Sequence, residues 1–345
     1  MLEILGKTNI DFMGKRQFAF LFSGIMVLLG LIALVFSISH IIPADPVRVI
    51  AGDQATAEQI DALRTKLGLD RPLWEQFLSY LARVAQGDLG MSLFSQRPIV
   101  EDLMARLPAT LELGISAVLL AVSVGVPLGV VSAVYRNSPL DHVVRVVSVS
   151  GLAIASFWLA MELQLLFSMK LAWTPLSGRI AGFPPEPRSG FMIIDALMDG
   201  DREALDSALR HLALPTLTLA LPAAAQLVRL TRAGVLEVIN SNHVLYQRAM
   251  GFPARVIVWK YVLRAAMTAT VTQIGLIFGV YVLAGAIVVE TVFDWPGIGL
   301  FAVNSILRSD YNGIVGFTIW AGLIFIVVNL VVDLVHSFID PRIVR

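Results

Sequence analysis

Six long apolar runs determine what this chain of 345 residues can fold into. A helix that crosses a bilayer needs about 20 mostly apolar residues, because the hydrocarbon core is about 30 Å thick. Backbone polar groups find no water there, so spanning segments outside closed barrels must be helical. We therefore expect an all-α integral membrane protein with six transmembrane helices, at residues 18–39, 109–134, 146–168, 211–228, 265–289 and 311–337.

The composition agrees with this class. Hydrophobic residues make up 57% of the chain and charged residues 15%, whereas soluble proteins carry about a quarter charged residues. The absence of cysteine excludes disulfides, thiolate metal ligands and a cysteine nucleophile. The first run follows Lys15 and Arg16, as the core of a signal peptide would. At roughly 22 residues it is longer than such a core, and we interpret it as a membrane anchor after a cytoplasmic tail, residues 1–17.

Basic residues indicate the orientation, because cytoplasmic loops of membrane proteins carry an excess of Lys and Arg. Half of the 26 Lys and Arg residues lie in the two tails and in the second and fourth gaps between runs. The fourth gap is the most basic, since Arg229–Arg264 holds six bases and one acid. We predict that both termini are cytoplasmic (N-in, C-in) and that the basic segment, residues 241–264, lies on the same side.

The gaps on the other side are long. Residues 43–107 are expected to form a helical extracytoplasmic insert between the first two spans, and residues 169–210 an extracytoplasmic loop. The insert could receive a soluble partner, cover the span ends, or do both. Its first helix would begin with a capping box, Thr56 with Gln59, present Ile60, Leu63 and Leu67, and end at Gly68; its second would open at Pro72 and present Trp74, Phe77, Leu78 and Leu81.

Proline and glycine residues occur at several positions within the apolar runs. Pro215 and Pro222 are expected to kink the fourth helix, because each removes a backbone donor. Small residues four apart allow two helices to approach closely. Such pairs occur in the second and fifth runs, at Gly125 with Gly129 and at Gly275 with Gly279.

Ionisable residues inside spans mark functional sites more often than other residues do. Glu112 and Asp333 lie near span ends, where they could reach interfacial water. Glu162 lies deeper; it could line a solute path or pair with a polar residue of a neighbouring helix. We take Glu162, Gln164 and Gln273 as candidates for the translocation path.

Motifs that carry catalysis are missing. The sequence has no phosphate-binding G-x-x-x-x-G-K-[ST] loop, no H-E-x-x-H and no G-x-S-x-G, and its five histidines are scattered. Gly297 and Gly299 fit a turn better than a dinucleotide site, because no strand precedes them. We expect no catalytic residue, no bound metal or cofactor and no nucleic-acid partner.

The basic segment has a helical pattern that ends at a glycine. Gly251, followed by Phe252-Pro253, fits a helix stop and a turn back to the bilayer. Such a helix could dock into a groove of a soluble partner through the apolar residues Val244, Leu245, Ala249 and Phe252, while Arg248 and Arg255 pair with acids. It could also anchor on anionic membrane lipid.

Several stretches resemble one family, the permeases of ABC importers. The basic segment, with Gly251, resembles their coupling loop, and the whole chain resembles the B-type subunit of the dipeptide/oligopeptide/nickel branch. The other stretches that carry the resemblance are Gly68–Ile99, Arg106–Leu113, His211–Val238, Val288–Tyr311 and Asn329–Ile343.

The resemblance implies a type I ABC importer permease fold, a single transmembrane domain over residues 18–345, in a bacterial or archaeal cytoplasmic membrane. Such a subunit binds no ATP itself; ATP and Mg bind to two cytoplasmic ATPase subunits. The other implied partners are a second homologous permease and an extracytoplasmic solute-binding protein. The solute stays open among dipeptides, oligopeptides, glutathione, nickel chelates and sugars. The residues implied to couple to the ATPase are Val244, Leu245, Tyr246, Arg248, Ala249, Gly251, Phe252 and Arg255.

The basic segment also departs from the family pattern. Arg248, Ala249, Gly251 and Arg264 match it, whereas the lysine, histidine, asparagine and proline common in the family are replaced. A channel or secondary transporter without ATP remains the alternative function, and it would need charged relays or inverted repeats. A third alternative is a structural or assembly subunit.

Overall fold

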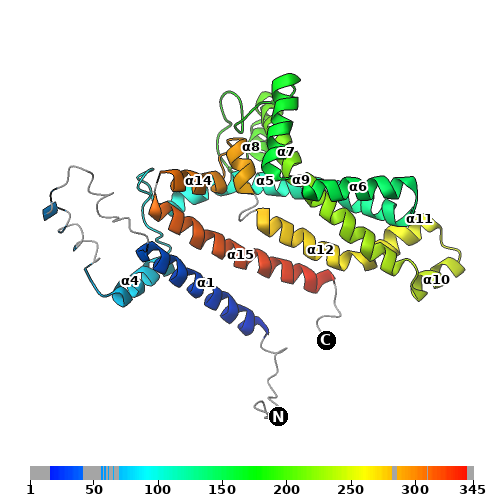
Figure 1. Cartoon of the computed structure of the whole chain (residues 1–345), viewed down its shortest axis with the longest axis horizontal. Helices are drawn as coiled ribbons and strands as arrows, with labels where there is room; N and C mark the ends of the chain where they lie inside the picture. Colours follow the sequence, from blue (N-terminus) through cyan, green and yellow to red (C-terminus); the bar gives the residue numbers. More distant parts are fainter. Residues whose placement is uncertain are drawn as a thin grey trace, which may run out of the picture.

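The computed structural model describes residues 16–41, 70–281, 286–308 and 310–339, with the single residues 56, 58, 59, 61 and 65. These residues form helices and connecting turns, with one isolated bridge between Met91 and Pro98. The long helices run along the longest axis of the molecule (Figure 1). At one end of this axis lies α10 (Asn242–Ala249), and at the other lie α4 (Leu73–Ala85) and α14 (Ile298–Leu307). The expected all-helical class is confirmed.

Among the described residues, four helices are long and apolar enough to span a membrane, or five if a bent pair counts as one span. The four are α5 (Ile99–Val134), α9 (Arg202–Val238), the run Ala254–Val280 and the stretch Asn312–Val331 of α15 (Tyr311–Ile339). The run Ala254–Val280 comprises α11 (Ala254–Val256), the π-helix η2 (Ile257–Val262) and α12 (Leu263–Val280). In α1 (Arg16–Ile41) the stretch Phe22–Leu34 is a shorter apolar helix by the same measure.

The third expected span, residues 146–168, is not one straight helix. It is divided between α6 (Pro139–Ala153) and a second arm, α7 (Ser156–Leu163) continued by the π-helix η1 (Gln164–Lys170), at an angle of 103°. Ile154 and Ala155, between the arms, have extended backbones. Both are apolar, so the hydrophobic pattern continues through the bend. Packing fixes the two directions: α6 packs on α9, and α7 packs on α9 and on α13 (Ala286–Val292).

The central helix is α9, which packs against α5, α6, α7, α12 and α8 (Met192–Asp199). It extends beyond the expected span, residues 211–228, at both ends. Asp201 caps the observed start by accepting a hydrogen bond from the Ala204 N–H at 3.0 Å. The helix continues through Pro215 and Pro222 without a break.

The ends of the other helices agree with the expected span ends to different degrees. α1 and α15 agree with the expected spans to within two residues at each end, but α5 begins ten residues before the expected start at 109. The expected fifth span falls on α12 and α13, with residues 282–285 outside the described residues.

In the insert, Thr56 and Gln59 form the expected reciprocal capping box, at 3.0 and 3.4 Å, and α4 is the expected second helix. The remaining residues proposed for the first insert helix, Ile60, Leu63, Leu67 and Gly68, lie outside the described residues.

Glycines bring α5 and α9 into backbone contact. A Cβ added to Gly125 would lie 2.9 Å from the carbonyl oxygen of Ala224, and one added to Gly129 would lie 2.8 Å from that of Val228. The close approach expected from this glycine pair is confirmed. In the fifth run, a Cβ on Gly279 would meet Val328 of α15 at 3.0 Å.

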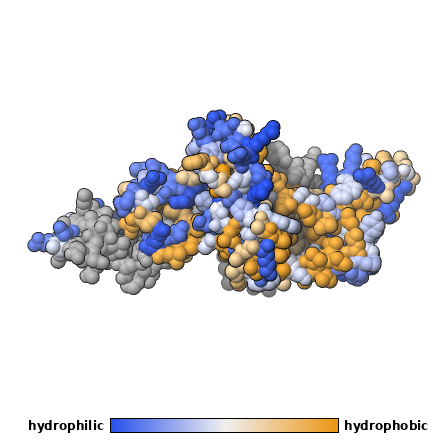
Figure 2. Space-filling view, turned by 90° about the horizontal axis from the view of Figure 1, so that it is seen from above, coloured by the Kyte–Doolittle hydropathy of each residue, from blue (hydrophilic) through white to orange (hydrophobic). Residues whose placement is uncertain are grey.

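The surface agrees with a membrane location. On the face shown in Figure 2, hydrophobic residues gather on the right-hand half. The far right tip, where Figure 1 places α10 and α11, is polar. The basic segment therefore lies at a polar end of the molecule, beyond a hydrophobic surface.

Candidate functional site

The basic segment is held on the ends of three long helices by a small apolar core. Val244 of α10 is completely buried, together with Ile257 and Val262 of η2. They pack with residues of α5, α9 and α12, namely Val130, Ala133, Val235 and Ala266. Val244 was expected on the docking face, and this expectation was wrong, because the side chain points into the protein.

Most of the other residues of α10 are exposed. Leu245, Tyr246, Arg248 and Ala249 are exposed, and so are Met250, Phe252 and Arg255 after the helix. The Phe252 ring packs edge-on against Tyr261 of η2 at 5.9 Å, which fixes the turn against the next helix. The remaining predicted docking residues are therefore accessible, and they include apolar and cationic side chains.

The turn after α10 requires a glycine. Gly251 has φ +78°, a left-handed conformation that residues with a Cβ rarely adopt. The Gly251 N–H donates to the Arg248 carbonyl at 3.0 Å, and the Phe252 N–H donates to the Gln247 carbonyl at 3.2 Å. These two bonds are the Schellman arrangement that ends helices, so the helix stop predicted at Gly251 is confirmed.

A buried ion pair ties α6 to α9 near the basic segment. The carboxylate of Asp141 accepts two hydrogen bonds from Arg232 of α9, from Nε at 2.8 Å and from Nη2 at 3.0 Å. It also accepts from the Ser132 hydroxyl of α5 at 2.6 Å and from the Asn137 N–H at 3.0 Å. Asp141 is completely buried. Four hydrogen bonds satisfy this carboxylate, and they join three helices six residues before α9 ends.

A second buried ion pair is centred on Glu112 of α5. Its carboxylate accepts from Arg179 Nε at 3.0 Å and from Arg179 Nη2, and it accepts from the Ile193 N–H of α8 at 2.9 Å. The Arg179 guanidinium also lies over the Trp295 ring, 5.7 Å from its centre. The expectation that Glu112 reaches interfacial water was wrong, because an arginine 67 residues away covers it.

Close to this pair, Asp195 orders the start of α8. Its carboxylate accepts from the N–H and hydroxyl groups of Ser189 at 2.8 and 2.7 Å, and from the Gly190 N–H at 3.0 Å. Burial alone would raise the pKa of Asp195, but these hydrogen bonds to the charged form outweigh it and lower the pKa below its ordinary value.

Glu290 of α13 forms a third cluster with the same part of α5. The Thr110 hydroxyl donates to Glu290 Oε1 at 2.7 Å and accepts from the Ile298 N–H at 2.9 Å. Glu290 Oε2 accepts from the Leu300 N–H at 3.0 Å. Gly297 contacts the carboxyl group so closely that a Cβ would overlap it. This glycine forms the expected turn before α14, and Glu290 caps the first turn of that helix.

Thr110→Val should destabilise the protein by about 1–3 kcal/mol, because it removes the hydroxyl that donates to Glu290 Oε1 and leaves the buried Ile298 N–H without a partner. The substitution preserves the shape of the side chain. The matched control is Thr291→Val on α13, whose exposed hydroxyl bonds only within its own helix, to the Ile287 carbonyl. Thermal unfolding of both purified variants checks the prediction, and equal unfolding midpoints would contradict it.

The three residues predicted to line the translocation path differ in their contacts and exposure. Gln164 donates to the carbonyls of Leu176 at 2.8 Å and Val292 at 3.1 Å, so its amide holds η1 to neighbouring segments. Glu162 is exposed on α7, and Gln273 is half-buried on α12. The side chain of Asp333 lies outside the described residues.

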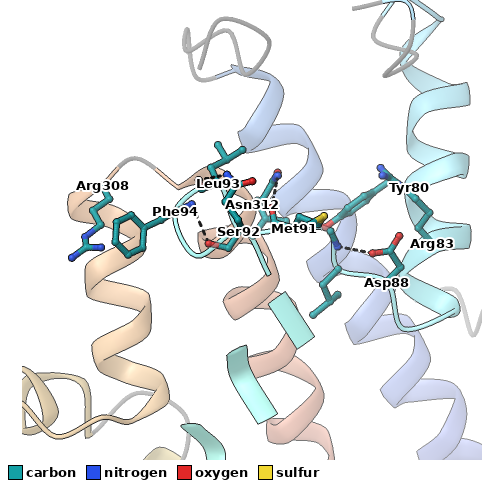
Figure 3. Close-up of a pocket in the computed structure, with 13 residues that line it drawn as sticks. Tyr80, Arg83, Asp88, Met91, Ser92, Leu93, Phe94, Arg308 and Asn312 are labelled. Atoms are coloured by element: carbon teal, nitrogen blue, oxygen red, sulfur yellow. Dashed lines mark hydrogen bonds between the residues drawn. The ribbon is translucent and has the colours of Figure 1, made fainter. Parts of the chain in front are cut away.

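A cavity of about 650 Å³ lies between α4, the turn 88–96 and the junction of α14 with α15. Burial raises the pKa of its Tyr80 hydroxyl to about 12. Figure 3 shows Arg83 and Arg308 at opposite sides of the cavity, and the guanidinium of Arg308 stacks on Phe94. The two cations therefore do not converge on one ligand. Within the described ranges, no group of three or more His, Cys, Asp or Glu residues could hold a metal ion.

Sequence reasoning missed the three buried carboxylate clusters. Asp141 follows Ser138-Pro139, a recognisable helix start, and could have been marked as a residue of that first turn. Nothing local connects it to Arg232, or Glu112 to Arg179, because these pairs are 91 and 67 residues apart in the chain.

The long apolar helices and the exposed segment at one polar end define a multi-pass membrane protein. The profile of the family described as "Binding-protein-dependent transport system inner membrane component" matches residues 125–345, and the profile of the N-terminal part of such components matches residues 10–114. The chain belongs to this family of transport permease subunits, which are not themselves enzymes.

The chain is similar to several curated permeases along almost its whole length. It is 42% identical over 323 residues to the "Probable D,D-dipeptide transport system permease protein" of Escherichia coli K12, covering 93% of this chain and 95% of the relative. The dipeptide transport system permease protein of the same strain is 38% identical over 320 residues, covering 91% and 94%. The di/tripeptide transport system permease protein of Pseudomonas aeruginosa UCBPP-PA14 is 39% identical over 317 residues, covering 91% and 94%. The resemblance to the dipeptide-type ABC importer branch is confirmed, and these relatives do not support the channel alternative.

Proposed function

We propose that this chain is the permease subunit of an ATP-driven importer of dipeptides or similarly short peptides. The observation that carries the proposal is the exposed face of α10, held by buried Val244 on the ends of α5, α9 and α12. The substrate class follows the relatives, which are named for dipeptides, D,D-dipeptides and di- or tripeptides. A solute-binding protein would select among these solutes.

In the proposed topology six spans place both termini and α10 in the cytoplasm of a bacterial or archaeal cell. The direction of two helices supports this: α1 begins and α15 ends at their right-hand ends in Figure 1, toward α10. The helices α4 and α14 lie toward the opposite end. The net positive charge of Arg229–Arg264 agrees with a cytoplasmic position.

In the proposed assembly this chain lines half of the path, and a second, homologous permease lines the other half. Two cytoplasmic ATPase subunits bind ATP and Mg, and one of them receives the exposed face of α10. When the ATPases close, α10 moves with them. Because Val244 locks α10 to the long helices, that movement would reorient α9 and α12 rather than bend the segment. Leu245, Tyr246 and Phe252 would fill the groove of the ATPase, and Arg248 and Arg255 would pair with its acids.

Single-cysteine cross-linking tests this function, since the chain has no cysteine of its own. In the reconstituted transporter, Tyr246→Cys should cross-link to an ATPase subunit, and uptake of a labelled dipeptide should require ATP and the binding protein. Ser79→Cys, exposed on α4 at the other end, is the matched control and should not cross-link. If Tyr246→Cys in the complete assembly reacts with a water-soluble thiol reagent and forms no cross-link, the proposed docking is contradicted. Dipeptide uptake without ATPase subunits would sink the proposed function.

A further inference from the structure

The apolar residues of α4 are only partly covered by the neighbouring helix α1. On one flank Phe77 packs edge-on against Phe36 of α1 at 5.3 Å, and Tyr80 lies 6.0 Å from the same ring. Three large apolar residues of α4 stay exposed: Trp74 at 64% and Leu78 at 55% on the adjacent flank, and Leu73 at 61% in the first turn, on the same side as Phe77. An amphipathic helix normally buries such residues, and none of the other described segments covers them.

The contact with Phe36 fixes the depth of α4 relative to the bilayer. Phe36 follows Arg16, the first residue of α1, by 20 residues. At 1.5 Å per residue this is about 30 Å, the thickness of the hydrocarbon core. The charged start of α1 therefore places Phe36 at the opposite boundary of the core. Figure 1 shows α4 beside this end of α1, away from the end where α1 begins.

The chemistry of the uncovered flank fits lipid at that boundary. Trp is enriched where hydrocarbon meets headgroups, because its ring is apolar and its N–H is polar. Leu73 and Leu78 add apolar area without charge. The other side of α4 carries Ser79 and Arg83, which are exposed and suited to water. The neighbouring helix α1 also exposes apolar side chains, among them Met26 and Leu34.

We propose that Leu73, Trp74 and Leu78 are seated in the lipid interface beside α1. In this arrangement α4 is a membrane-surface helix. It holds the end of the first span at a fixed depth. The bilayer, rather than a soluble protein, is the partner of this flank.

Two neighbouring positions test the proposal, Leu78→Cys on the apolar flank and Ser79→Cys about 100° around the helix. Both residues are exposed, so a nitroxide label at either one needs no repacking. The complete transporter is reconstituted in phospholipid nanodiscs, and collisions of each label with oxygen and with a water-soluble nickel chelate are measured. Uptake by the labelled proteins in vesicles verifies that each assembles.

Oxygen concentrates in lipid and the nickel chelate in water. The ratio of oxygen to nickel collisions should therefore be several-fold higher at position 78 than at position 79. Equal ratios that favour nickel at both positions would place the flank in water and overturn the proposal. Shielding of position 78 from both reagents, appearing only when the solute-binding protein is bound, would also overturn it and identify a protein docking surface instead.

Discussion

Replacing Gly251 by valine should lower dipeptide uptake about five- to thirtyfold while the ATPase subunits continue to hydrolyse ATP. Gly251 has φ +78°, and a left-handed conformation costs a residue with a Cβ roughly 1–2 kcal/mol. A free energy of this size corresponds to a five- to thirtyfold change in the population of the turn. Without the Schellman turn the exposed face of α10 loses its fixed direction. Uptake and ATP hydrolysis are measured together in vesicles that contain the whole transporter.

The surroundings of Gly251 allow a clean control. No other atom lies within 4 Å of a Cβ added there, so the effect of valine comes from the backbone and not from a collision. Asparagine tolerates the left-handed region far better than valine does. Gly251→Asn should therefore keep most of the uptake. Normal coupled uptake by Gly251→Val, at normal membrane abundance, would show that the turn does not transmit the motion.

Removing Arg232 should destabilise the folded protein by about 3–5 kcal/mol, because Arg232→Ala leaves the buried Asp141 carboxylate without its cation. The Arg232 side chain is only 19% exposed, and water cannot easily replace it. The expected result is a large loss of folded protein, measured as the fraction that stays monodisperse after mild heating in detergent. The double variant Asp141→Asn with Arg232→Ala should recover part of the loss, since it removes the unpaired charge.

A second arginine near the same carboxylate is the matched control. Arg145 Nε lies 3.7 Å from Asp141, on the same helix, and its side chain is 43% exposed. An exposed pair of this kind contributes about 0–1 kcal/mol. Arg145→Ala should therefore be close to the unchanged protein. Equal losses for Arg145→Ala and Arg232→Ala would contradict the assignment of Arg232 as the partner that Asp141 requires.

The sequence predicts those parts of the fold that depend on one segment at a time. α1 and α15 were located to within two residues because each is an unbroken apolar run. Asp201 after Gly200 is a recognisable helix start for α9, although the long apolar run begins only at about His211. The bend at Ile154 and Ala155 could not be predicted, because neither of these apolar residues favours a helix break. The packing of the two arms on α9 and α13 determines it.

The candidate site, too, could be predicted only where one short segment determines the structure. The helix stop at Gly251 follows from local geometry, and its prediction is confirmed. Which face of α10 points inward does not follow, since both Val244 and Leu245 are apolar and only the neighbouring helices bury one of them. The buried carboxylates could not be foreseen because their partners come from distant parts of the chain, as Glu112 and Arg179 do.

The bend between α6 and α7 gives the third segment the geometry of a lever. Asp141 fixes α6 to α9, whereas Gln164 fixes the other arm to the carbonyls of Leu176 and Val292. The second arm, Ser156–Lys170, extends about 22 Å nearly at right angles to α6. A rotation of α6 by about 10° around its own axis would therefore sweep the far end of this arm sideways by roughly 4 Å. Such a displacement would either break the hydrogen bonds of Gln164 or move Leu176 and Val292 together with the arm that carries Glu162.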